Sequence, residues 1–301
     1  MGRLTAIVLG AAAGGGFPQW NCRCEVCRLA WAGDSRVRPR TQASLAVSAD
    51  GRRWTLLNAS PDLRAQIQAV PALRPCEGTR GSPIDAVLLT GAEIDQTAGL
   101  LSLRERQPFM LHATIATLAA LAANPMFGAL DPEVVSRIIV EPGVRFTLAG
   151  GIDVDLFKVP GKVPLYLEED DHPVIEETAA NVGVELSAGG KRLAYVPGAA
   201  AVTPALKERL ARADVLLFDG TLYRDDEMIA TGTGEKTGRR MGHIPIDGAD
   251  GSLAALAGLT NRRIFIHINN TNPILVDGSP QRARVEAAGW EVATDGLEIV
   301  L

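Results

Sequence analysis

Three cysteines, Cys22, Cys24 and Cys27, crowd into the segment WNCRCEVCRLAW near the N-terminus. Three thiolates this close together can converge on one soft cation, and Zn(II) with a fourth ligand from elsewhere is the outcome we expect. Because all three come from one loop, the predicted site is closed and structural. The alternative is a group of buried, reduced thiols. Candidates for the fourth ligand lie in the late segment HINNTNP, namely Asn270 or His267.

A second set of metal ligands is indicated by the segment TGAEIDQTAGLL, which follows the strand-like run PIDAVLL. Glu93 and Asp95 stand one residue apart, and Gln96 follows directly. In a metal-dependent hydrolase we would expect histidines at such a strand end. The segment therefore has the composition of a metal site that has lost part of its nitrogen ligands.

Two further polar side chains stand at the ends of apolar runs. His267 closes the strand-like run RRIFI and precedes a cluster of amides, and Asp219 closes ADVLLF just before a glycine. A lone His at a strand end is often structural, and a lone Asp there is often a helix cap or a turn residue. The dense amides after His267 favour a site, because amides are costly to bury and serve well to orient ligands or substrate.

Together, Glu93, Asp95, Asp219 and His267 offer three carboxylates and one imidazole. A donor set rich in oxygen suits Fe(II), Mn(II) or Mg(II) better than tightly held Zn(II), and it predicts a weakly held metal. His243, flanked by glycine in GRRMGHIPIDG, could supply a second imidazole or act as an acid or base, unless it is an exposed loop residue. The remaining histidines, His112 and His172, are assigned to structure or surface.

The elements that must position these residues alternate along the chain. Strand-like runs are predicted at 4–10, 42–49, 53–60, 84–90, 151–160, 191–198, 213–220 and 262–269. Helix-like stretches are predicted at 61–70, 203–213 and 279–290, the last leading into a final pair of strands. This pattern predicts an α/β chain with a mixed sheet. We expect one domain over residues 1–301, built from two packed sheets with helices outside.

Composition narrows the choice of partners and compartment. The chain of 301 residues carries a net charge of −5, so it has no basic footprint for nucleic acid. No apolar run approaches the roughly 20 residues needed to span a bilayer. The N-terminal run imitates a signal peptide, but it fits a buried first strand followed by a tight turn equally well. A cytoplasmic location is expected, and four cysteines in this spacing form no disulfide framework.

These motifs together resemble the metallo-β-lactamase superfamily. Its T-H-x-H-x-D-H signature is matched here by Thr90, Gly91, Glu93, Asp95 and Gln96, and Asp219 and His267 match its bridging Asp and its late His. The CxCxxC motif and HINNTNP are similar to the RNase Z-like branch that carries an extra zinc site. AAGGGFPQWNCRC, SRVRPRTQAS, LLNASPDLR, FDGTLYRDDEM, GEKTGRRMGHI and HINNTNPIL resemble the PqqB family. Gly91 and Gln96 depart from the superfamily pattern, and Gln96 also departs from what we expect in the PqqB family.

The resemblance implies an αββα sandwich and a role in making pyrroloquinoline quinone (PQQ) from a Glu- and Tyr-containing peptide. One version is an enzyme in which Fe(II) and dioxygen hydroxylate the tyrosine ring of the precursor, with Asp95, Asp219, His243 and His267 as catalytic residues. The other is a carrier that moves PQQ or its precursor towards the periplasm. A phosphodiesterase or lactonase is a third alternative, which the stripped signature disfavours.

Two further expectations concern partners. A carboxylate-rich substrate could be bound by arginines, for which the candidates are Arg36, Arg38, Arg40, Arg239 and Arg240. A homodimer is expected, with Trp20 and Trp31 beside the cysteine loop as interface anchors.

Overall fold

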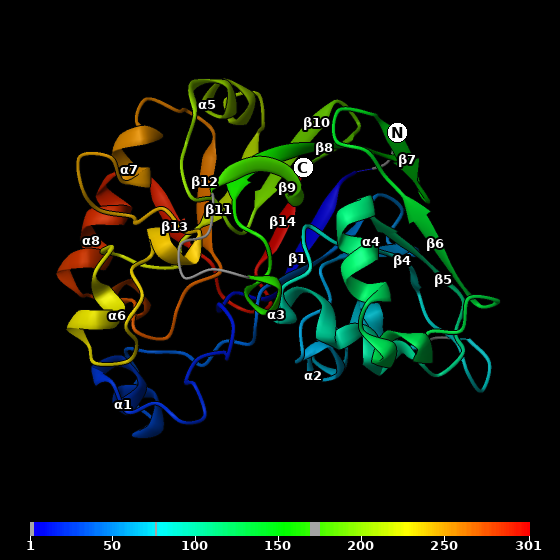
Figure 1. The fold of residues 1–301 in the computed structure, drawn as a ribbon, viewed down its shortest axis with the longest axis horizontal. Helices are drawn as coiled ribbons and strands as arrows, with labels where there is room; N and C mark the ends of the chain where they lie inside the picture. Colours follow the sequence, from blue (N-terminus) through cyan, green and yellow to red (C-terminus); the bar gives the residue numbers. More distant parts are fainter. Residues whose placement is uncertain (1–2, 76, 169–174) are drawn as a thin grey trace.

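The computed structural model describes residues 3–75, 77–168 and 175–301. Two seven-stranded sheets pack face to face (Figure 1). The first has the order β14 (Glu298–Val300), β1 (Thr5–Gly10), β2 (Ser44–Ser48), β3 (Trp54–Leu57), β4 (Ile84–Leu88), β5 (Phe109–Ala113) and β6 (Val135–Ile139). The second has the order β13 (Trp290–Val292), β12 (Arg262–Ile266), β11 (Val215–Asp219), β10 (Lys191–Val196), β9 (Glu176–Ala188), β8 (Ile152–Gly161) and β7 (Phe146–Leu148).

Both sheets are mixed. Strands β3 to β6 run parallel to one another, as do β10 to β13, while β1 with β2 and the run β7 to β10 pair antiparallel. Parallel neighbours bring their carboxyl ends to the same edge of a sheet, which is where ligands bind in open α/β sheets. This arrangement decides where the strand-end residues meet.

The central strands are apolar on both faces because one face of each sheet packs against the other sheet and the opposite face packs against helices. In β11, Val215 and Leu217 face the core between the sheets, whereas Leu216 and Phe218 pack with the outer helices. This alternation follows from the two-residue period of a strand. It explains why the central strands appear in the sequence as continuous apolar runs.

Helices cover the outer faces. They are α1 (Glu25–Trp31), α2 (Leu63–Ala69), α3 (Ile94–Thr97), α4 (Ile115–Ala122), α5 (Pro204–Leu210), α6 (Glu227–Ala230), α7 (Ser252–Ala255) and α8 (Pro280–Ala287). Short 3-10 turns are η1 (Pro71–Leu73), η2 (Ala98–Leu103), η3 (Pro125–Ala129), η4 (Leu165–Leu167), η5 (Arg239–Met241) and η6 (Pro273–Leu275). In Figure 1, α7 and α8 lie beyond β11 to β13, and α4 lies on the side of β4 to β6. The α/β class and the sandwich of two packed sheets are thus confirmed.

Some elements differ from the sequence-based expectation. The predicted final pair of strands does not form: β13 adds to β12 in the second sheet, whereas β14 adds to β1 in the first. The long strand β9 was not predicted, because its first half is polar or small and largely exposed. Among the described residues, no helix is long and apolar enough to cross a membrane. His172 and Cys76 lie outside the described residues.

Candidate metal centres

Two polar side chains meet at the carboxyl ends of the parallel strands β11 and β12. Asp219 ends β11 and lies opposite Ile266, so that His267, the next residue, stands beside it. Both side chains are buried. His267 has a φ of +58°, a left-handed conformation that is uncommon outside glycine. Such strain persists where the surrounding structure imposes it, often at functional sites.

Asp95 from α3 and His243 from the loop after η5 complete the group. Asp95 Oδ2 lies 2.8 Å from His267 Nε2, and Asp219 Oδ2 lies 2.7 Å from His243 Nδ1. The two imidazole rings stack with their centroids 5.2 Å apart. One ligand atom each of Asp219, His243 and His267 lies within 4.8 Å of the others. Ligands of one small cation stand roughly 3 to 4 Å apart, so these donors fit one after small side-chain movements.

Thr221 links the members of this group from behind. Its hydroxyl donates to Asp219 Oδ1 at 2.6 Å and lies 2.8 Å from His267 Nδ1. Asp219 Oδ2 also accepts from the backbone N–H of Ala199 at 2.9 Å. These contacts orient the rings and the carboxylate as outer-shell partners do around metals. Thr221 was not anticipated from the sequence, although it follows Asp219 by two residues.

The carboxylates and imidazoles of this group shift the pKa values of Asp95, Asp219 and His267. Burial alone would raise the pKa of Asp95, but the hydrogen bond and charge of His267 bring that pKa below its ordinary value. Burial also works to raise the pKa of Asp219, and the charge of His243 with its hydrogen bond lowers that pKa overall. Burial would lower the pKa of His267, whereas Asp95 raises it. The two carboxylates are therefore anionic and attract a cation.

Glu93 and Gln96 line the same cavity, but their side chains are engaged in other hydrogen bonds. Glu93 accepts from Lys162 Nζ at 3.2 Å and from the N–H of Leu165 at 3.2 Å. Gln96 Oε1 accepts from the N–H of Glu93 at 3.2 Å, which forms a capping box at the start of α3. A Cβ on Gly91 would stand only 2.6 Å from that same Gln96 oxygen. Glu93, expected as a metal ligand, is thus held by Lys162 and by the backbone of Leu165.

A cavity of about 590 Å³ opens onto the group, and a metal bound there would face it. Asp95, His243 and His267 line it, together with Thr221 and Asn269. Its wall also carries the apolar side chains of Ile94, Leu165, Tyr166, Met228 and Met241. The volume falls in the range of sites for small molecules.

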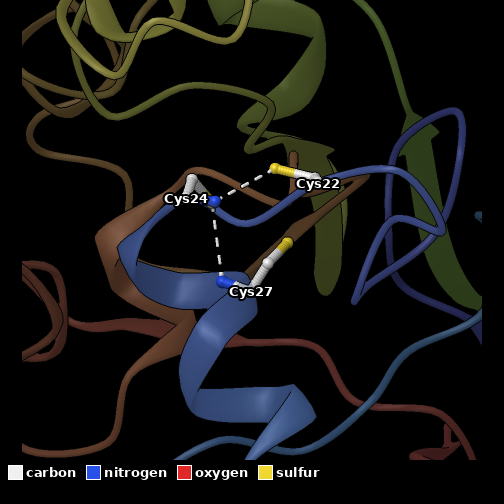
Figure 2. A group of neighbouring side chains, drawn as sticks. All are labelled: Cys22, Cys24 and Cys27. Atoms are coloured by element: carbon white, nitrogen blue, oxygen red, sulfur yellow. Dashed lines mark hydrogen bonds between the residues drawn. The ribbon is translucent and has the colours of Figure 1, made fainter.

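The three cysteines form a second cluster (Figure 2). Their ligand atoms all lie within 4.8 Å of one another, with Cys22 just before α1, Cys24 as its N-cap and Cys27 in its first turn. The N–H of Cys24 points to Cys22 Sγ at 3.4 Å, and the N–H of Cys27 points to Cys24 Sγ at 3.5 Å. Backbone donors aimed at sulfur favour thiolates, which are the form that binds metal.

Asn270 closes this cluster from the far end of the chain. Its Nδ2 lies 3.1 Å from Cys22 Sγ and 3.3 Å from Cys27 Sγ, and its backbone oxygen lies 3.7 Å from Cys24 Sγ. Both nitrogens of His267, the other candidate fourth ligand, are engaged by Asp95 and Thr221. Asn270 is thus the polar residue of HINNTNP that reaches the sulfur atoms.

The arginines predicted to bind substrate lie in different environments. Arg240 lines the cavity, whereas Arg36 pairs with half-buried Asp34 and Arg239 with exposed Asp250. Arg40 is buried, and its guanidinium donates to the backbone carbonyls of Ala293 and Arg38. The sequence could not show which of these side chains turn inward, because Arg36, Arg38 and Arg40 stand in irregular segments and Arg239 and Arg240 in the single 3-10 turn η5, too short for a periodic pattern.

Comparison with known proteins identifies the family. A family model described as "Beta-lactamase superfamily domain" matches residues 53–268. A relative named "Coenzyme PQQ synthesis protein B" from Methylorubrum extorquens is 58% identical over 296 residues, 98% of this chain and 99% of its own. A relative of the same name from Rhizobium meliloti is 55% identical over 299 residues, 99% of this chain and 98% of its own.

Solved structures agree. The crystal structure of Zn(2+)-bound PqqB from Methylobacterium extorquens has a TM-score of 0.97 and 57% identity, covering 99% of this chain and all of its own. A diphosphatase from the PhnP family, at 21% identity, shares the fold with a TM-score of 0.70, covering 99% of this chain and 97% of its own. The chain therefore belongs to the beta-lactamase superfamily and, within it, to the family of coenzyme PQQ synthesis protein B.

Proposed function

We propose that the chain hydroxylates the tyrosine ring of a Glu-Tyr precursor during PQQ synthesis, with Fe(II) held by Asp95, Asp219, His243 and His267. The observation that carries this proposal is the convergence of two imidazoles and two carboxylates at one end of a substrate-sized cavity. Two histidines with a carboxylate and open positions are typical of non-haem Fe(II) oxygenases. The names of the relatives support the pathway.

Bound Fe(II) would supply dioxygen activation, which redox-silent zinc would not. The side chains of the protein would bind the metal and orient its ligands. Thr221 fixes the His267 ring through Nδ1, so Nε2 faces Asp95 and the cavity. His243 is partly exposed to the cavity and lies against Asp219, so it can also hold a proton near the substrate.

The reaction must balance. Converting an aromatic C–H into C–OH with one atom of O2 consumes two electrons and two protons, and it releases the other oxygen atom as water. A two-electron reductant, for example ascorbate, is therefore a co-substrate in the proposed reaction. The apolar wall near Leu165 and Tyr166 suits the aromatic ring.

For the cysteine cluster we propose one structural Zn(II), held by Cys22, Cys24 and Cys27 with Asn270 as the fourth group. The crystallised zinc-bound relative and the close approach of the sulfur atoms support it. Three thiolates from one loop suit a closed zinc site.

The test is turnover under ¹⁸O2. Fe(II)-loaded protein with ascorbate and a Glu-Tyr peptide should add one ¹⁸O to the phenol ring, detected by mass spectrometry. Asp219→Ala and His267→Ala should lower the rate at least about a hundredfold, because each removes a ligand, without loss of zinc. His112→Phe is the control, since His112 does not line the cavity. Absence of labelled product together with tight binding of PQQ would instead establish a carrier.

A further inference from the structure

The cavity wall carries a cluster of charges separate from the metal centre. Lys162, Lys236 and Arg240 surround the carboxylate of Glu168, and all four side chains line the cavity. Glu168 is only 7% exposed, and Lys162 is 8% exposed. Burying charge is costly unless it is paired, so this concentration of charges on one cavity wall requires a reason.

Lys162 contacts both carboxylates of this cluster. Its Nζ lies 2.8 Å from Glu168, 3.2 Å from Glu93 and 3.2 Å from the backbone oxygen of Val163. Glu93 and the carbonyl of Val163 accept hydrogen bonds from this ammonium, whereas its contact with Glu168 Oε1 is an ion pair without a hydrogen bond. Of the three cations Lys162 is the most buried, at 8% exposed against 18% for Arg240 and 41% for Lys236, so it is the least accessible to a ligand.

Arg240 and Lys236 have donors to spare. Both terminal nitrogens of Arg240 reach the same oxygen of Glu168, each at 3.2 Å, so the guanidinium is not in its favoured two-oxygen geometry. Lys236 lies 3.8 Å from that oxygen and is 41% exposed, a loose contact. One carboxylate oxygen thus faces two cations that a better-placed carboxylate could satisfy.

The charges also fail to cancel. Three cations, Lys162, Lys236 and Arg240, meet two carboxylates, Glu93 and Glu168, which leaves a net charge of +1 on this wall. The metal centre carries two carboxylates of its own, Asp95 and Asp219. A ligand with a carboxylate and an aromatic ring would therefore orient in this cavity, with the carboxylate towards Arg240 and away from those acids.

We propose that Arg240 and Lys236 form a subsite for a substrate carboxylate, and that Glu168 occupies it as an internal competitor until substrate arrives. The proposal rests on the proposed function for its ligand, a Glu-Tyr precursor. Glu168 keeps the two cations paired in the free protein. A substrate carboxylate that takes the donors of Arg240 leaves Glu168 on Lys162, which already holds its other oxygen.

The experiment measures binding without turnover. Anaerobic protein, as purified, is titrated by calorimetry with Glu-Tyr dipeptide and with glutaminyl-tyrosine amide, which keeps the N-terminal ammonium but has no carboxylate. Wild-type protein should prefer the acid, and Arg240→Gln should weaken acid binding about tenfold while leaving the amide unchanged. Lys236→Gln should act in the same direction but more weakly. Arg239→Gln is the matched control, because this neighbour pairs with exposed Asp250.

Glu168→Gln separates a binding role from a structural one. If Glu168 competes with substrate, its neutralisation should tighten acid binding severalfold, the opposite of the effect at Arg240. Weaker acid binding in Glu168→Gln, or an equal loss for acid and amide in Arg240→Gln, would overturn the subsite. The outcome is independent of oxygenation: a preference for the acid without ¹⁸O transfer keeps the subsite and rejects the enzyme, and transfer without the preference does the reverse.

Discussion

His112 in β5 is a buried histidine whose ring stacks on Phe146 with centroids 5.2 Å apart. Neither ring nitrogen has a hydrogen-bond partner within the part of the chain that the structure describes. Burial lowers the pKa of His112 below its ordinary value, because a charged ring would lose its hydration there. The neutral ring packs like a flat apolar side chain, and at acidic pH its burial lowers the stability of the folded protein.

Its removal should change how stability depends on pH. The unfolded chain takes up a proton at His112 below about pH 6.5, whereas the folded protein takes it up only at lower pH. Stability from the neutral ring is therefore fully present above pH 6.5 and falls as the pH drops towards the folded pKa, by up to about 1.4 kcal/mol per pH unit. His112→Phe should be more stable than wild type at pH 5, and this advantage should shrink at pH 7.5. Urea unfolding at both pH values measures it, and an unchanged difference would contradict it.

At the residue scale, the sequence indicates a site residue only where its position in a regular element, such as the end of an apolar strand, marks it out. Asp219 and His267 could be predicted because each closes an apolar strand. Lys162 and Glu168 could not, since charged loop residues look alike whether they face solvent or a cavity. For His243 the sequence left open a ligand or an exposed loop residue, and only the folded loop places it against Asp219.

The short helix α3 relates two positions at which this chain departs from the superfamily signature. Gln96 caps the N-terminus of α3, and its oxygen occupies the space that a side chain at position 91 would need. Gly91 and Gln96 therefore fit each other. A histidine restored at position 91 alone would collide with Gln96, so position 96 is the one to restore first.

Gln96→His should have two opposite effects. Loss of the capping box should lower the free energy of unfolding of the metal-free protein by about 1 kcal/mol, and Gln96→Ala should match this loss. Only the histidine variant should bind Mn(II) or Fe(II) more tightly, by about tenfold or more, because it adds an imidazole beside Asp95. Anaerobic metal titration of both variants checks this, and equal affinities would show that position 96 cannot reach the metal.

At the scale of elements, strands with a strong apolar pattern could be predicted from the sequence. Strands without such a pattern, which form because they pair with neighbouring strands, could not. β11 and β12 are continuous apolar runs. β9 is a strand of thirteen residues that begins with exposed polar side chains and is ordered by pairing with β8 and β10. Tertiary pairing, rather than local preference, makes it a strand.

For the whole molecule, the cysteine cluster joins distant parts of the chain. Cys22 and Cys27 belong to the N-terminal loop and α1, and Asn270 follows His267 by three residues. A metal bound there would brace the backbone that carries His267. Trp20 and Trp31 are 83% and 56% exposed beside it, and the homodimer stays a prediction.

Replacing Cys22, Cys24 and Cys27 by Ser should remove about one equivalent of zinc and lower Tm by about 10 °C or more, because structural zinc contributes to folding. Elemental analysis and calorimetry measure both quantities. Cys76→Ser, which changes the cysteine outside the motif, should leave zinc and Tm as they are. A triple variant that melts like wild type would rule out the structural role.

The four ligands of the candidate active centre differ in how firmly the fold holds them. Asp219 ends the interior strand β11 and His267 directly follows the interior strand β12, whereas His243 stands on a loop beside Gly242, whose φ is +86°. Local opening of that loop costs far less than global unfolding. The residence time of a bound cation would then depend on the fluctuations of one loop, and the protein could exchange its metal quickly while remaining folded.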